Sequence, residues 1–171
     1  FAVDTVTITN PTAILFNTSS SNVSCFGYND GQITISAVAG GTPGYNYSID
    51  DGVSYSSALV HSSLDTGTYI VIVRDTNLCE NETLITITEP TEIAVTATTT
   101  NVLCNGDSTG TATLTISGGT PGFIQDWGLN NPNSLSAGTH NYTITDTNSC
   151  PFSASVTIAE PLTAITSSVA I

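Results

Sequence analysis

Four cysteines are the residues of this 171-residue chain whose type and spacing most directly predict a chemical bond. They fall into two pairs, Cys25 with Cys79 and Cys104 with Cys150, one pair in each of two similar stretches of sequence. Four cysteines permit three connectivities, and only these pairings give both stretches the same bond. A zinc site would require clustered Cys and His, and the two histidines do not recur in register. We therefore predict one disulfide within each repeat, which is typical of an oxidising compartment.

Two aspartates occupy matching turns that precede the last cysteine of each pair. Asp75 begins Asp-Thr-Asn-Leu-Cys, and Asp146 begins Asp-Thr-Asn-Ser-Cys. Such an aspartate can accept hydrogen bonds from backbone N–H groups of its own turn, which is the interpretation we favour. The alternative is a repeated calcium site, because calcium prefers several oxygen ligands. Beyond this calcium candidate we expect no metal and no cofactor.

The charge balance excludes several function classes. Lys+Arg number 1 against 14 Asp+Glu, so the net charge is −13. With Arg74 as the sole strongly basic side chain, the chain has no positive patch for nucleic acid or anionic membranes. No lysine is present, and no motif joins a serine, a histidine and an aspartate, so we expect no enzyme activity. No apolar run is long enough to predict a membrane span.

Several polar residues fit glycosylation patterns. Five asparagines open an N-x-[ST] sequon, and two short Asp-Thr or Asp-Ser patterns resemble bacterial O-glycosylation acceptors. These candidates are Asn17, Asn22, Asn46, Asn81, Asn141, Thr5 and Ser108.

The chemistry-bearing residues sit in a duplicated sequence. The run Gly-Gly-Thr-Pro-Gly at 40–44 returns at 118–122, and Asp-Thr-Asn returns with its cysteine. Alternating Val, Ile, Thr and Tyr between Gly, Asn and Pro turns predicts β-strands and no helix. The expected strands are 12–17, 32–39, 45–50, a weak 57–62, 68–74 and 82–88, then 92–98, 111–117, 123–128, a weak one near Ser134, 139–145 and 153–159.

The alignment of the two copies predicts which side chains face the core. Tyr69, Val71 and Val73 align with His140, Tyr142 and Ile144, whereas the residues between them become polar in the second copy. Trp127 aligns with Ile49 and should point inward, and Asp65–Tyr69 has the form of a tyrosine corner. We predict an all-β chain of tandem immunoglobulin-like antiparallel β-sandwiches, one disulfide each, with the two bonded loops at the same pole.

The ends and junctions of the copies predict a continuing array. Residues 11–90 form the first repeat and 91–161 the second, and they are joined through Glu-Pro without a Gly/Ser linker. Because proline fixes φ, we expect a stiff joint. Residues 1–10 resemble an orphan last strand and 162–171 an orphan first strand, which are either truncation points or donor strands. The strand-exchange candidates are Thr5, Val6, Thr7, Ile8, Thr9, Ala164 and Ile165.

Taken together, these motifs resemble the SprB-type repeats of cell-surface adhesins from gliding Bacteroidota. The shared pattern is Cys, Gly-Gly-Thr-Pro-Gly with an aromatic residue, Gly-Thr-Tyr, Asp-x-Asn-x-Cys and Thr-Ile-Thr-x-Pro. The resemblance implies a long, secreted, surface-attached filament.

We therefore expect an extracellular structural and adhesive repeat protein at the cell surface. Its partners would be neighbouring copies of the repeat, in the same chain or by strand exchange in a homopolymer, and surface glycans are candidate ligands. The alternative function is an accessory carbohydrate-binding β-sandwich module of a larger secreted protein.

Overall fold

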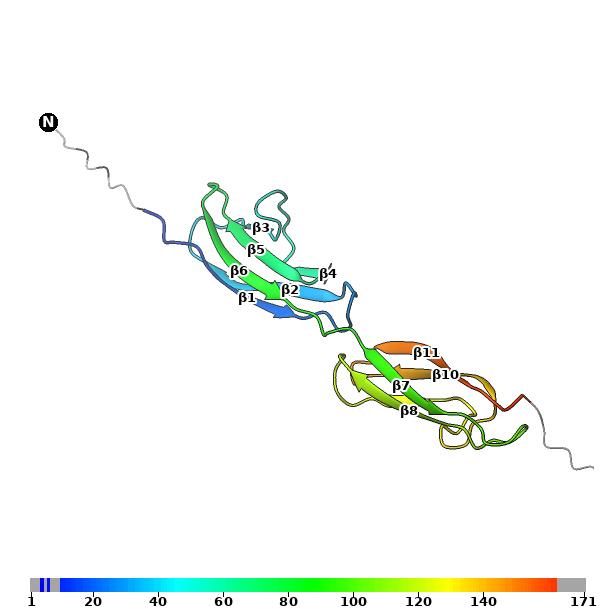
Figure 1. Ribbon diagram of the computed structural model, residues 1–171. Helices are drawn as coiled ribbons and strands as arrows, with labels where there is room; N and C mark the ends of the chain where they lie inside the picture. Colours follow the sequence, from blue (N-terminus) through cyan, green and yellow to red (C-terminus); the bar gives the residue numbers. More distant parts are fainter. Residues whose placement is uncertain (1–3, 5, 7–9, 163–171) are drawn as a thin grey trace, which may run out of the picture. The chain divides into compact units, whose positions relative to one another are not determined.

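A computed structural model describes residue 4, residue 6 and residues 10–162 (Figure 1). The chain divides into two compact units between Glu89 and Pro90. Most of the predicted end strands, including Thr5, Thr7, Ile8, Thr9, Ala164 and Ile165, lie outside the described residues. Val6 is described and exposed.

The first unit consists of two antiparallel sheets, as the alternating sequence predicts. One has the order β1-β2-β4 and the other β3-β5-β6. Their bounds are β1 (Leu15–Ser21), β2 (Gly31–Ala39), β3 (Asn46–Ser48), β4 (Val60–Leu64), β5 (Gly67–Arg74) and β6 (Glu80–Ile87).

The second unit has the same order of elements without a counterpart of β4. Here β7 pairs with β8, and β10 lies between β11 and β9. The bounds are β7 (Ala94–Thr100), β8 (Thr111–Ser117), β9 (Ile124–Asp126), β10 (Gly138–Thr145) and β11 (Pro151–Ile158). The strand predicted near Ser134 is reduced to one bridge, Gly110 to Leu135.

One hydrophobic core in the first unit receives side chains from both sheets. Alternation along β2 buries Ile33 and Ile35. On β5, Val71 and Val73 belong to the same core cluster, whereas Ile72 between them is also buried but lies outside that cluster. Burying each such side chain contributes about 1.5–3 kcal/mol. The inward face predicted for β5 is therefore confirmed.

The core of the second unit confirms the alignment of the copies. His140, Tyr142 and Ile144 are all buried on β10. Trp127 follows β9 directly, is 6% exposed, and packs on Tyr142 with ring centroids 5.0 Å apart. The predicted inward Trp is confirmed.

The first strand of each unit begins later than predicted. Expected at 12–17, β1 occupies Leu15–Ser21, and β7 likewise runs on to Thr100. Both stretches end in Ser or Thr, which show no apolar alternation. They pair nonetheless because β2 and β8 offer them backbone partners, continuously along β7 and with one register shift between Leu15 and Asn17 on β1.

Candidate functional site

A buried aspartate ties two turns together in each unit. Asp75 is 1% exposed, and its Oδ2 accepts a hydrogen bond from Thr42 N at 2.8 Å. Its Oδ1 accepts from Asn77 N and Cys79 N, both at 2.9 Å. The Gly-Gly-Thr-Pro-Gly turn is thereby fixed to the turn between β5 and β6.

The second unit builds the same arrangement, which we call the aspartate clasp in both units. Asp146 is 4% exposed, and it accepts from Thr120 N at 2.8 Å and from Cys150 N at 2.9 Å. The Asx-turn interpretation of both aspartates thus has direct geometric support.

Hydrogen bonding holds the pKa of both clasp carboxyls below the ordinary value of 3.8. For Asp75 the N–H of Thr42 is the largest cause of the lowered pKa. For Asp146 burial is the largest single influence and raises the pKa, but the N–H groups of Thr120, Cys150 and Asn148 together outweigh it. Both aspartates are therefore held as carboxylates at neutral pH.

In the clasp, backbone N–H groups occupy the positions around these carboxylates that a cation would otherwise take. Their oxygens are already occupied by backbone donors, and among the described residues no group of three or more His, Cys, Asp or Glu could hold a metal ion. Calcium at Asp75 and Asp146 stays a prediction for a chelation experiment.

The double glycine in each turn has a steric cause. A Cβ on Gly40 would lie 2.0 Å from Ala13 O, and one on Gly118 would lie 1.9 Å from Glu92 O. Both glycines also have positive φ, 79° and 71°. Any other residue would clash with the backbone that enters the unit, so the repeated Gly-Gly is required by close approach.

The two cysteines of each repeat lie at opposite ends of the last strand. Val23 N donates to Thr88 O, which places Cys25 beside the end of β6, whereas Cys79 immediately precedes β6. This strand has 8 residues, so its ends are about 25 Å apart at about 3.3 Å per residue. A disulfide requires Cα atoms about 4.4–6.8 Å apart.

The prediction of a disulfide within each repeat is therefore wrong. Cys25 and Cys150 are disulfide-bonded, whereas Cys79 and Cys104 carry free, exposed thiols. In the second unit Val102 N donates to Ala159 O, so Cys104 lies beside the end of β11 and Cys150 at its start.

Both bonded loops were expected at one pole, which requires all six strands of a repeat to alternate in direction. β4 is antiparallel to β2, as β1 is, and β3 is antiparallel to β5, as β6 is. Contacts at both ends of β1 and β6 show that these two run the same way. β3 and β4 therefore share a direction, which moves the last cysteine to the other pole.

The segment that joins the units is bonded to each of them. On the first unit, Gly27 N donates to Glu89 Oε2 at 2.7 Å, and Thr88 N donates to Asn22 Oδ1 at 3.0 Å. On the second unit, Gly119 N donates to Thr91 O at 2.8 Å. Pro90 is the residue left between these anchors.

The same joint recurs at the end of the second unit. Gly106 N donates to Glu160 Oε2 at 3.1 Å, and Asn105 Nδ2 donates to Pro161 O at 3.1 Å. Sequence analysis missed this role of the glutamates. The signal was present, because Glu-Pro and Cys-x-Gly both occur in each copy.

The predicted tyrosine corner is confirmed in the first unit and altered in the second. Tyr69 Oη donates to Asp65 O at 3.0 Å. At the matching position, His140 Nε2 lies 2.9 Å from Ser136 O, also four residues upstream, and its Nδ1 lies 3.2 Å from Asn130 Oδ1. A histidine thus replaces the phenol in holding the preceding loop.

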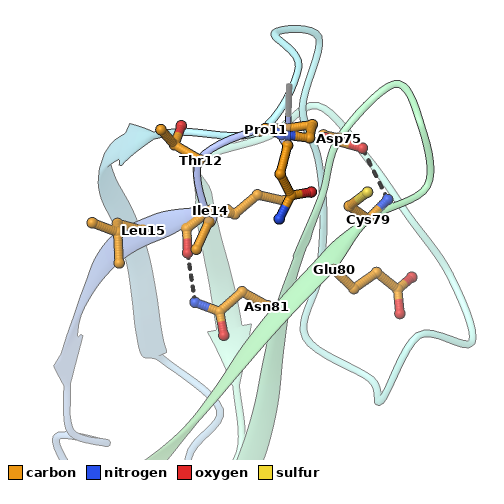
Figure 2. A pocket seen from close by; sticks show the side chains of 11 residues that line it. Pro11, Thr12, Ile14, Leu15, Asp75, Cys79, Glu80 and Asn81 are labelled. Atoms are coloured by element: carbon orange, nitrogen blue, oxygen red, sulfur yellow. Dashed lines mark hydrogen bonds between the residues drawn. The ribbon is translucent and has the colours of Figure 1, made fainter. Parts of the chain in front are cut away.

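A pocket of about 330 Å³ opens at the start of β1 and β6, beside the first aspartate clasp (Figure 2). The Asn81 side chain donates to Ile14 O at 2.8 Å across its floor. Its lining residues are Asn10, Pro11, Thr12, Ala13, Ile14, Leu15, Gly41, Asp75, Cys79, Glu80 and Asn81. Cys79 therefore presents its free thiol at a concave surface.

The glycosylation candidates are dispersed over both units, except Thr5, which lies outside the described residues. Asn17, Asn46, Asn141 and Ser108 are exposed. Asn22 and Asn81 are also exposed, but their side chains already bond Thr88 N and Ile14 O. A glycan on either would compete with those bonds.

Comparison with known protein families finds one repeat family, which matches two stretches of the chain. A model of the SprB repeat matches residues 17–54 and again residues 96–124. No curated protein and no solved structure matches the chain. Within the described residues, no helix is long and apolar enough to cross a membrane.

Proposed function

This chain carries SprB repeats at residues 17–54 and 96–124, and on that premise we propose that it is part of a repetitive cell-surface adhesin whose repeats form a stiff extracellular filament. The family is one of surface adhesin-type repeats, and the disulfide-bonded cysteines fit an oxidising exterior. Its role is mechanical and adhesive rather than catalytic.

The joint between the repeats carries the stiffness proposal. The connecting residues are fixed to the first unit by Glu89 and to the second by Thr91, and a proline with restricted φ stands between them. A flexible linker would need several unbonded residues. The matching bonds of Glu160 to Gly106 N and of Ala159 N to Asn101 Oδ1 would let a following repeat attach in the same way.

We further propose that each repeat is an immunoglobulin-like sandwich. The two-sheet core of the first unit, the tyrosine corner at Tyr69 and the buried Trp127 in the second unit support this assignment. Neighbouring repeats are the primary partners. The weakly charged Ser, Thr and Asn surface would keep a long array soluble, with surface glycans as candidate ligands of the adhesin.

Small-angle scattering of the whole chain tests the stiffness. A Gly-Ser-Gly-Ser insertion between Glu89 and Pro90 should broaden the distribution of dimensions relative to the unaltered chain. The matched control places the same insertion after Gly128, where a Cβ would have no neighbour within 4 Å. If the unaltered chain is already as broad as the joint variant, the joint is not stiff.

Electron microscopy of the native surface tests the filament itself. We expect fibres with a repeat close to the length of one unit. Specific binding of a defined sugar by the chain, in the absence of any fibre, would instead favour the accessory carbohydrate-binding module.

A further inference from the structure

Cysteine chemistry in these repeats follows a rule that the sequence alone did not indicate. Each repeat has a loop cysteine, Cys25 or Cys104, beside the end of its last strand, and a turn cysteine, Cys79 or Cys150, at the start of that strand. One loop cysteine and one turn cysteine are disulfide-bonded, and one of each kind is free. The free pair, like the bonded pair, therefore consists of one loop cysteine and one turn cysteine.

The residue before each cysteine separates the two states. Ser24 and Ser149 precede the bonded cysteines, whereas Leu103 and Leu78 precede the free ones. These leucines are 78% and 70% exposed. Both free thiols thus have an apolar neighbour and both bonded thiols a polar one. Such a difference would let each cysteine select a partner of its own kind.

Leu78 is a particularly informative case. It has φ of 64°, a left-handed conformation that is unfavourable for a leucine, and Ser149 holds the matching place with φ of 67°. The backbone shape is therefore the same with either residue. The leucine is 70% exposed, so most of its apolar surface remains open to a partner.

Both free thiols are held where a second molecule can reach them. Cys79 N donates to Asp75 Oδ1, and Cys79 lines the pocket of Figure 2, to which Ile14 and Leu15 also contribute. In the opposite loop, Leu103 N donates to Thr109 Oγ1 at 3.1 Å, and Asp107 N donates to Cys104 O at 3.1 Å. The two partners are thus ordered before they meet, which lowers the cost of association.

We propose that copies of this chain join head to tail through a disulfide between Cys79 of one copy and Cys104 of the next, with Leu103 entering the apolar pocket beside Cys79. The proposal extends the proposed filament by giving it a covalent continuation.

Bond formation requires an oxidant. The two thiols together lose two protons and two electrons to a disulfide compound, which leaves as two thiols after passing through a mixed disulfide. In the test this oxidant is oxidised glutathione, and at the cell surface it would be the disulfide of a thiol oxidoreductase.

Two single variants of the full chain, Cys79→Ser and Cys104→Ser, separate head-to-tail bonding from random thiol oxidation. In a glutathione redox buffer, the unaltered chain should give a ladder of oligomers on non-reducing gels that collapses with dithiothreitol. Each variant alone should stay monomeric, because its remaining thiol lacks the complementary partner. An equimolar mixture of the two should stop at the dimer.

The junction of that dimer can be located and its apolar part measured. Digestion after acidic residues is needed because Arg74 is the sole tryptic site, and mass spectrometry should find a peptide linking Cys79 to Cys104. Leu78→Ser with Leu103→Ser should slow dimer formation at least threefold, whereas Ser108→Ala should leave it unchanged. Circular dichroism confirms that these surface variants fold.

Dimers of either single variant at the yield of the mixture, or a 79–79 or 104–104 peptide, would overturn the proposal. So would a leucine double variant that dimerises at the unaltered rate. Native fibres in which Cys79 and Cys104 stay free would sink this inference alone and leave the proposed filament standing.

Discussion

The two units of this chain have the same arrangement of strands except at β4, which is present in the first unit and reduced to a single bridge in the second. The first has a five-residue β4 that pairs with β2, and the second meets β8 through the single bridge between Gly110 and Leu135. Both keep the aspartate clasp, the double glycine and the Glu-Pro joint. The features at the ends of the repeat are thus preserved, while its middle strand is dispensable.

Loss of a strand in the second unit is offset by burial of a single side chain. Leu135 is 1% exposed, whereas the corresponding Leu64 at the end of β4 is half-buried. Ala112 N also donates to Pro132 O, whereas in the first unit the bond from Ile35 N to Leu59 O lies two positions further along the strand. Backbone bonds of Gly110 and Ala112 thus hold the shorter segment to β8.

The largest expected effect probes what the units share. Asp146→Ala removes the acceptor of three N–H groups, those of Thr120, Asn148 and the buried Cys150, and a buried group left without a partner costs about 1–3 kcal/mol. We expect the second unit to lose about 3–5 kcal/mol, measured by urea unfolding with Trp127 fluorescence, since the sole Trp reports on that unit. Asp75→Ala should instead destabilise the first unit and leave the Trp127 transition nearly in place.

Asp107→Ala is the matched control for the clasp, because Asp107 is an exposed carboxylate of the same unit. Its midpoint should not move. Equal loss of stability in Asp107→Ala and Asp146→Ala would mean that the clasp contributes nothing beyond its charge.

The second largest expected effect tests the region where the units differ, at Leu135 and Leu64. Leu135→Ala creates a cavity at a fully buried site and should cost about 3 kcal/mol, whereas Leu64→Ala should cost about 1 kcal/mol because β4 keeps its ladder. Urea midpoints from circular dichroism and Trp127 fluorescence give both values. Equal costs would show that Leu135 does not compensate for the missing strand.

The duplicated sequence allowed most of the fold to be predicted, because each copy served as a control on the other. Positions apolar in both copies, such as Val71 with Tyr142, proved to be core. What failed was cysteine pairing, which depends on strand direction. The short return segment around Ser56, which bridges Tyr47, reverses the chain once more without an alternating pattern that sequence could reveal.

The local half of the clasp, the Asx-turn, was predicted for a physical reason, whereas the bond to Thr42 and the Glu-Pro joint were missed for another. An aspartate two residues before an asparagine in a turn has a local geometry that sequence encodes. The bonds of Glu89 to Gly27 span 62 positions, and no local pattern specifies them. Only recurrence of both motifs in each copy could have indicated their contact.

A smaller effect sharpens the contrast between the two corners. Tyr69→Phe removes one hydrogen bond to Asp65 O and should cost about 1 kcal/mol. His140→Phe removes the contacts with Ser136 O and Asn130 Oδ1 and should cost about 2 kcal/mol. Urea unfolding measures both. A cost-free His140→Phe would mean that burial alone matters at this position.

The smallest expected effect is the acid sensitivity of the clasps. Their folded pKa lies below the unfolded value of 3.8, so the stability they contribute is present above about pH 4 and declines as pH falls through the folded pKa. The effect is smaller than that of Asp→Ala because a protonated carboxyl keeps one oxygen that can accept a hydrogen bond. Urea midpoints between pH 6 and pH 2.5 should fall below pH 4.

Asp146→Asn serves as the comparison, because an amide does not titrate. The Trp127-monitored midpoint of this variant should depend less on pH than that of the unaltered chain. The first unit has two more carboxyls with a lowered pKa. Hydrogen bonds from Ser24 lower the pKa of Asp30, and Ser48 and then Ser54 lower that of Asp50 to about 2, but exposure to solvent limits the contribution of both. Parallel pH profiles for Asp146→Asn and the unaltered chain would show that the second clasp is not the group whose protonation loosens its unit.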